Sequence, residues 1–262
     1  MTKQTFFATL FFLSAMFVQA QTREDFVAKL EAINMDNKKE QLAVLDQALK
    51  AFPKDADLYS RRADLKTTME QAFSKKDTYG FMADYTKAIE FENVSWRYGM
   101  RANGKMLLED YKGALADCNT AVTMAEKAGE KEHIFSAYFG RINANAFLKD
   151  YKSALADTEV AIKNNFEPNG SFVATMLSSG GDFAEELSDF ELAIKYFERA
   201  ATIYKTLSDD TEGLMYMKMG EVKAEKMNNP KDGCVYFKKA LAINDGGIFK
   251  NDINAKIKKY CK

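Results

Sequence analysis

One segment of this chain occurs twice, and no other feature constrains the fold as strongly. Residues 110–117 read DYKGALAD and residues 150–157 read DYKSALAD, so seven of eight positions are identical at a separation of 40 residues. A weaker pattern, an alanine followed in most cases by a larger apolar residue, recurs at Ala48, Ala88, Ala121, Ala161, Ala200 and Ala240. A period of this size is typical of repeat proteins, and it predicts about six units between residues 21 and 246.

Each unit is expected to be a pair of helices. Mostly apolar or small residues stand three and seven positions before each of these alanines, and this spacing places them on one helix face. An earlier helix is expected in each unit, most clearly over residues 98–108 and 138–148. Asp110, Asp150 and Asp189 stand where an N-cap would begin the second helix. Because a lone helix pair cannot bury both of its faces, we predict an all-α fold, an α-solenoid of stacked antiparallel helix pairs.

The two ends of the chain differ from the repeats. Residues 6–18 form an apolar run that leads to Val18-Gln19-Ala20, so residues 1–20 are predicted to be a signal peptide. The run has 13 residues, fewer than the roughly 17 of a membrane-spanning helix, which disfavours the alternative of a membrane anchor. Residues 247–262 are expected to form a capping helix over the last repeat. We therefore expect an exported protein that is not inserted in a membrane after cleavage. The periplasm is the favoured location, and the extracellular space is the alternative.

The repeated residues resemble those of tetratricopeptide repeats. The matching positions are Tyr98, Arg101, Ala102, Asp110, Tyr111, Ala114 and Ala121 in one unit and Tyr138, Arg141, Asp150, Tyr151, Ala154 and Ala161 in the next. The resemblance covers residues 22–246 with a period of about 38 residues against the usual 34, and Sel1-like repeats are a related alternative. It implies a non-enzymatic scaffold or adaptor of the bacterial cell envelope. Such a protein binds a segment of a partner protein in a groove lined by the first helix of each unit.

Five residues are candidates for partner binding in that groove. Asn103 and Asn143, which are 40 residues apart, would hydrogen-bond the backbone of an extended segment. Trp96, Phe139 and Phe147 would contact its apolar side chains. The alternative is that the asparagines are only solvated and the aromatic rings pack between helices.

Arginines and aspartates also recur with the repeat. The first helix of three units carries an arginine, namely Arg62, Arg101 and Arg141. The helix that follows carries an aspartate in each case, namely Asp84, Asp117 and Asp157. We interpret them as interhelix ion pairs that set the register of the two helices. As partly exposed pairs they would contribute only about 0–1 kcal/mol each, so their role would be geometric. The alternative is an arginine ladder for an acidic ligand.

The three cysteines divide by position. Cys118 lies on the apolar face of a predicted helix and is expected to be buried as a small hydrophobic residue. Cys234 and Cys261 lie in the last unit and the terminal helix, where an oxidising compartment would allow a disulfide. The alternative is that all three thiols are free.

The composition argues against several other classes of function. The 37 basic and 38 acidic residues leave a net charge of -1, which gives no overall basic surplus for nucleic acid or anionic lipid. The single histidine, His133, is predicted to be a solvated residue of a connecting segment, and no CxxC pair offers metal ligands. We therefore expect no catalytic residue, no metal and no cofactor, hence a protein that is not an enzyme. An envelope glycan or small-ligand binding protein and a self-assembling structural protein are the alternative functions.

Overall fold

The computed structural model describes residues 21–69, 76–163, 170–207, 211–243, 247 and 249–262. The predicted signal peptide, residues 1–20, lies outside the described residues. None of the described helices is long and apolar enough to cross a membrane.

The described residues form helices and no strand, as predicted. The first helices of six successive pairs are α1 (Arg23–Ala32), α3 (Ala56–Met69), α5 (Ser95–Leu107), α7 (Lys131–Phe147), α9 (Gly170–Glu186) and α11 (Thr211–Glu221). The second helices are α2 (Lys38–Ala51), α4 (Phe81–Phe91), α6 (Tyr111–Ala128), α8 (Tyr151–Lys163), α10 (Phe190–Thr206) and α12 (Pro230–Ile243). A short π-helix, η1 (Val222–Lys226), continues α11, and α13 (Lys250–Tyr260) follows the last pair. The predicted α-solenoid is confirmed.

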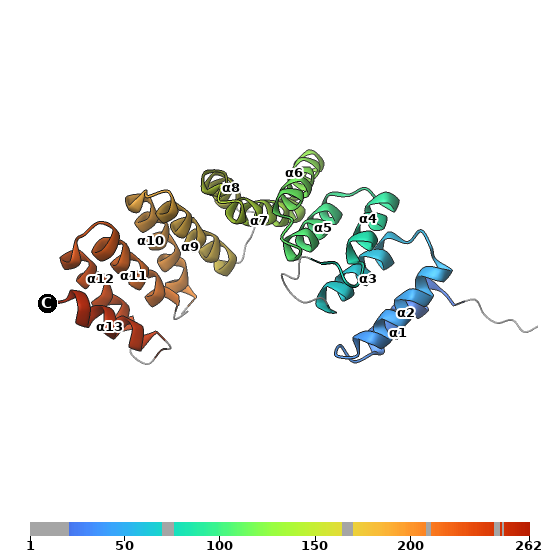
Figure 1. The fold of residues 1–262 in the computed structure, drawn as a ribbon, viewed down its shortest axis with the longest axis horizontal. Helices are drawn as coiled ribbons and strands as arrows, with labels where there is room; N and C mark the ends of the chain where they lie inside the picture. Colours follow the sequence, from blue (N-terminus) through green and yellow to red (C-terminus); the bar gives the residue numbers. More distant parts are fainter. Residues whose placement is uncertain (1–20, 70–75, 164–169, 208–210, 244–246, 248) are drawn as a thin grey trace, which may run out of the picture.

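The helix pairs stack along a curved path. In Figure 1 they form an arch, with α6 and α8 on its upper side and α7 below them at its middle. Packing is mainly between helices that are adjacent in the chain, and α5 also packs against α3 and α7. These additional contacts join the first helices of successive units and bring α5 and α7 side by side.

The turn inside the unit has the same construction in three successive pairs. Asp110, Asp150 and Asp189 each accept a hydrogen bond from the backbone N–H three residues later, so the predicted N-caps are confirmed. Each aspartate N–H donates to the carbonyl five residues earlier at 2.9 Å. The residues before the three aspartates have left-handed backbones, with φ between 59° and 61°. This common turn geometry explains why an aspartate recurs at the same place in the three units.

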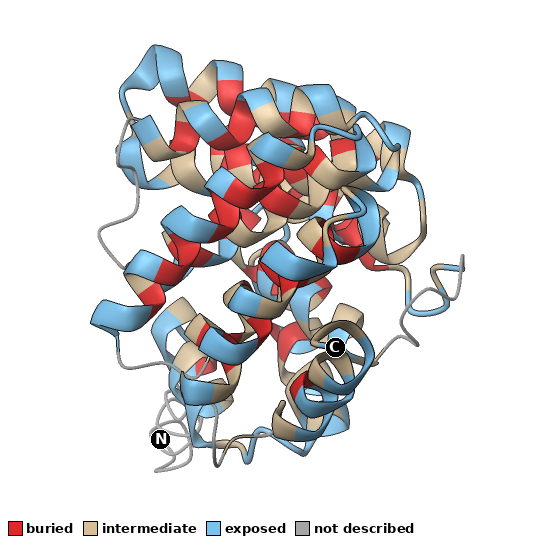
Figure 2. Cartoon of the chain, turned by 90° about the vertical axis from the view of Figure 1, so that its left-hand side faces the viewer, coloured by how far each residue is buried: buried red, intermediate tan, exposed pale blue. Residues whose placement is uncertain are grey.

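The core is formed by the sides of the helices that face each other, where the buried positions are drawn in red in Figure 2. The six alanines of the repeat pattern are each at most 3 % exposed. Some contacts are closer than alanine allows. A Cβ atom on Gly181 would lie 2.3 Å from Phe197 Cε1, and one on Gly220 would lie 2.5 Å from Phe237 Cε1. Glycine at these positions lets an aromatic ring of the second helix cross the backbone of the first.

The three predicted arginine–aspartate pairs form, and each is bidentate. They are Arg62–Asp84, Arg101–Asp117 and Arg141–Asp157, with N–O distances of 2.5–2.9 Å. The expectation that they are partly exposed is wrong for the carboxylates, which are only 3–8 % exposed. Lys66 and Lys105, one turn after their arginines, add a second cation to two of the pairs at 2.7 Å. Because breaking a buried pair is costly, these clusters are expected to stabilise the stack as well as set its register.

The cysteines occupy two environments. Cys234 of α12 and Cys261, which directly follows α13, form a disulfide. Cys118 is a free thiol that is 1 % exposed. Burial, helped by the nearby charge of Asp117, raises the pKa of the Cys118 thiol to about 12.

One connection differs from the prediction. His133 was expected to lie in a connecting segment, but α6 extends to Ala128 and α7 already begins at Lys131. Gly129 makes the reversal with a φ of 70°, which glycine adopts without strain. His133 therefore belongs to the first turn of α7 and is half-buried, so its prediction as a residue of a connecting segment is wrong.

Candidate functional site

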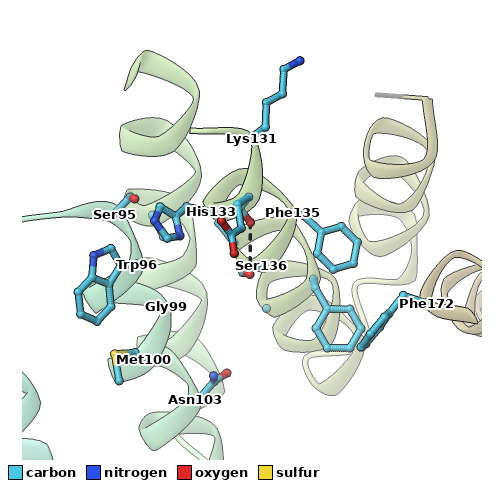
Figure 3. A pocket seen from close by; sticks show the side chains of 15 residues that line it. Ser95, Trp96, Gly99, Met100, Asn103, Lys131, His133, Phe135, Ser136 and Phe172 are labelled. Atoms are coloured by element: carbon cyan, nitrogen blue, oxygen red, sulfur yellow. Dashed lines mark hydrogen bonds between the residues drawn. The ribbon is translucent and has the colours of Figure 1, made fainter. Parts of the chain in front are cut away.

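A cleft lies where α5 and α7 meet. It has a volume of about 920 Å³ and is lined mainly by residues 95–103 of α5 and 131–140 of α7, with Phe172 of α9 at one end. Both helices are first helices of their units, so the cleft lies on the side of the repeat from which partner binding was predicted. We call it the central cleft, and Figure 3 shows its side chains.

Aromatic rings form one wall of the central cleft. Phe135 and Phe139, one turn apart on α7, have ring centroids 6.3 Å apart and ring planes inclined by 15°. Phe172 meets Phe135 edge-on at 6.1 Å and is 48 % exposed. In Figure 3, Trp96 of α5 lies across the cleft from Phe135. Partly buried rings on two sides, with the exposed Phe172 ring at one end, provide an apolar contact area for a ligand between them.

Trp96 is positioned by the residue that follows it. The guanidinium of Arg97 lies 4.1 Å from the centroid of the Trp96 ring, and Arg97 is 1 % exposed. Arg97 donates to Ser60 Oγ at 2.6 Å and to Asp57 at 2.8 Å, and it also pairs with Glu92. These contacts fix the beginning of α5 against α3 and leave the Trp96 ring at the wall of the cleft.

Polar groups accompany the rings. Asn103 is exposed on α5, and Ser136 on α7 donates to the carbonyl of Glu132 at 3.5 Å, the dashed line in Figure 3. Gly99 lines the cleft, and a Cβ atom there would meet nothing within 4 Å, so the missing side chain leaves open space. The cleft thus combines apolar surface with amide and hydroxyl groups at its edge. Among the residues that the structure describes, no three His, Cys, Asp or Glu side chains are grouped to hold a metal.

The structure brings together part of the predicted binding set. Of the five predicted residues, three line the central cleft, namely Trp96, Asn103 and Phe139. Asn143 lies on α7 but does not line the cleft. Phe147, at the end of α7, is 51 % exposed and stacks on Tyr111 with centroids 4.8 Å apart. Its ring therefore lies outside the cleft, against the N-terminus of α6.

The lining residues that were not predicted include Phe135, His133 and Phe172. The sequence could have identified Phe135, because it stands four residues before Phe139 and so shares its helix face. His133, in the first turn of α7, also lines the cleft. Phe172 comes from the next unit, and only the packing of α9 beside α7 brings its ring to Phe135.

Solved structures of other proteins share this architecture. PilW, a type IV pilus biogenesis factor, is similar with a TM-score of 0.65 and 13 % identity over 89 % of this chain and 98 % of that chain. YrrB, a tetratricopeptide protein, is similar with a TM-score of 0.56 and 17 % identity over 80 % and 97 %. A tetratricopeptide repeat protein from Parabacteroides merdae is similar with a TM-score of 0.52 and 15 % identity over 92 % and 83 %. No family model and no curated protein matches the sequence. The chain has the fold of tetratricopeptide repeat proteins.

Proposed function

We propose that this protein is a non-enzymatic scaffold that binds a segment of a partner protein in the central cleft. The observation that carries the proposal is the aromatic wall of α7 and α9, which lines the cleft beside Asn103 of α5, all on first helices of their units. The comparisons support the proposal, because YrrB is described as a protein with an unusual peptide-binding site.

The chemistry of the cleft fits an extended peptide. Backbone amides and carbonyls of such a segment need partners when they leave water, and the Asn103 amide and Ser136 hydroxyl supply donors and acceptors. Apolar side chains of the segment would contact the rings of Phe135 and Phe172. A volume of about 920 Å³ is near the upper end of the roughly 300–1,000 Å³ of ligand pockets, so a few residues of a peptide fit inside.

The test uses peptides selected from a random display library on residues 21–262. The double variant Asn103→Ala, Phe172→Ala removes one polar and one apolar contact, and we expect the selected peptides to bind at least about tenfold more weakly. The matched control is Asn143→Ala, Phe147→Ala, which removes the same two residue types outside the cleft. The control is expected to retain affinity.

Two results would reject the assignment of the cleft. Equal losses in both double variants would indicate a general effect on the stack. Full retention of affinity in the cleft variant would place the peptide elsewhere. If the library yields no binding peptide and glycan fragments raise the melting temperature, the glycan-binding alternative replaces the proposal.

We also propose that the protein works in the bacterial cell envelope after removal of residues 1–20. The support is the apolar run that ends in Val18-Gln19-Ala20, together with the disulfide between Cys234 and Cys261, which is typical of oxidising compartments. N-terminal sequencing of the protein from fractionated cells tests this proposal. A periplasmic product that begins at Gln21 is expected, and a cytoplasmic product that begins at Met1 would contradict it.

A further inference from the structure

The charges of this protein are segregated along the chain. Residues 222–262 contain ten lysines and four acidic residues, whereas the whole chain has a net charge of -1. The neutral total therefore conceals a basic segment that is compensated by acidic residues in earlier repeats. The basic segment covers η1, α12 and α13, at the opposite end of the arch from α1.

Four of these lysines surround a second cleft, which we call the basic cleft. It has a volume of about 750 Å³ between α12 and α13 and is lined by Lys231, Lys238, Lys259 and Lys262, with no acidic residue in its lining. All four lysines are exposed. Lys259 lies 3.9 Å from Glu225, but Lys256 binds that carboxylate more closely at 3.0 Å. Within the described part of the chain, the other three lysines have no acidic partner within 4.0 Å.

The disulfide holds the two sides of the basic cleft together. Cys234 lies on α12 beside Lys231 and Lys238, and Cys261 lies between Lys259 and Lys262. The Tyr260 ring stacks on Phe237 with centroids 5.8 Å apart, which orients the last turn of α13. Like charges that face each other across a cleft repel, so a covalent bond at this point maintains an arrangement that the lysines alone would oppose.

One apolar side chain stands among the lysines. Val235 is 64 % exposed, and it lines the basic cleft next to Cys234. Exposed lysines around an uncovered valine match a ligand that presents carboxylates on both sides of an apolar side chain. A concave surface of this size admits a chain segment, whereas a planar lipid surface would contact only its rim.

We propose that the basic cleft is a second interaction surface, which binds an acidic segment of a partner protein. Aspartates or glutamates of that segment pair with Lys231 and Lys238 on one side and with Lys259 and Lys262 on the other, and an apolar residue between them covers Val235. The site shares no residue with the central cleft, so it stands independently of the function proposed there.

The probe for the test is a short fluorescein-labelled peptide of Asp and Glu with one central Leu, and the reference is its Asn and Gln counterpart. Fluorescence anisotropy with oxidised residues 21–262 is expected to show binding of the acidic peptide only. Lys231→Gln, Lys238→Gln is expected to weaken that binding about 2- to 30-fold, because each exposed ion pair is worth about 1.4- to 5-fold. Raising NaCl from about 50 to about 300 mM is expected to weaken it further by screening.

A matched control removes two lysines that lie elsewhere. Lys112 and Lys152 are exposed at equivalent places in α6 and α8, and their double change to Gln is expected to leave peptide binding unchanged. Equal losses in both double variants would show attraction by total charge alone and would overturn the proposal. Binding of vesicles that contain phosphatidylglycerol, without binding of the peptide, would also overturn it.

A second variant tests the role of the disulfide. Cys234→Ser, Cys261→Ser keeps all four lysines, and buried Ile253 still holds α13 on the stack. We expect the freed last turn to weaken peptide binding severalfold while far-UV circular dichroism stays the same. Unchanged affinity in this folded variant would refute the idea that the bond assembles the two halves of the cleft.

Discussion

Replacing Asp117 by asparagine measures how much the buried ion clusters stabilise the stack. Asp117 is 5 % exposed, accepts two hydrogen bonds from Arg101 at 2.8 Å and lies 2.7 Å from Lys105 Nζ. Asparagine keeps the shape of the side chain and removes its charge. The change therefore leaves two cations together, with only 19 % and 18 % of their side chains exposed and without the carboxylate between them.

The expected loss follows from this burial. Removing one partner of a buried ion pair costs about 3–5 kcal/mol. Arg101 and Lys105 keep partial contact with water, so we expect the lower end, about 3 kcal/mol. At about 2–4 °C per kcal/mol for a chain of this size, the melting temperature falls by about 6–12 °C. Urea unfolding followed by far-UV circular dichroism measures the loss, and hydrogen exchange shows whether α5 and α6 open separately from the other units.

Asp46→Asn is the matched control. Asp46 pairs with Arg62 at 2.7 Å, but its side chain is 49 % exposed, so the expected loss is below about 1 kcal/mol. Equal small losses for Asp117→Asn and Asp46→Asn would refute the reasoning. The clusters would then have the mainly geometric role that was predicted for them.

Three further predictions follow from single features. Gly99→Ala is expected to stabilise the protein by about 0.5–1 kcal/mol because its Cβ meets nothing. Gly140→Ala is expected to stabilise the protein less, because its Cβ would lie 3.0 Å from Cys118 Sγ. Equal melting temperatures for the two variants would contradict this difference. The unfolded Cys118 thiol ionises near pH 9.0, and the folded thiol only near pH 12. Between about pH 8 and about pH 10.5 the wild type should therefore lose about 2 kcal/mol more unfolding free energy than Cys118→Ala, and parallel pH curves would contradict this. Reducing the Cys234–Cys261 bond, which closes 27 residues, should cost about 3.5 kcal/mol in urea unfolding, and coincident curves for oxidised and reduced protein would contradict that value.

The repeat could be predicted because its signals are local. The N-caps at Asp110 and Asp150 depend on neighbouring residues in the chain. The buried alanines recur at the spacing of a helix face, and the arginine–aspartate pairs recur with the same period. Because each of these features occurs in several units, comparing the units of this one chain with each other is enough to recognise it.

The composition of the central cleft was harder to predict because it depends on how successive units face each other. Phe172 reaches Phe135 from another unit, and nothing in its own neighbourhood marks it. Arg97 is buried against α3, yet it occupies no recurring position of the repeat. The burial of the three carboxylates likewise depends on the packing of two helices, and the sequence spacing alone shows only that the pairs can form.

Packing between chain neighbours also determines the order in which this molecule opens. The N-terminal helix pair is held on one side only, whereas α13 and the Cys234–Cys261 bond cover the C-terminal pair, so thermal fraying begins at α1 and proceeds inward one unit at a time. Two helix pairs precede α5, so both must open before the opening reaches the central cleft. The walls of the central cleft therefore exchange their amide hydrogens later than α1 to α4 do, and they outlast the loss of the N-terminal repeats to heat or to a protease.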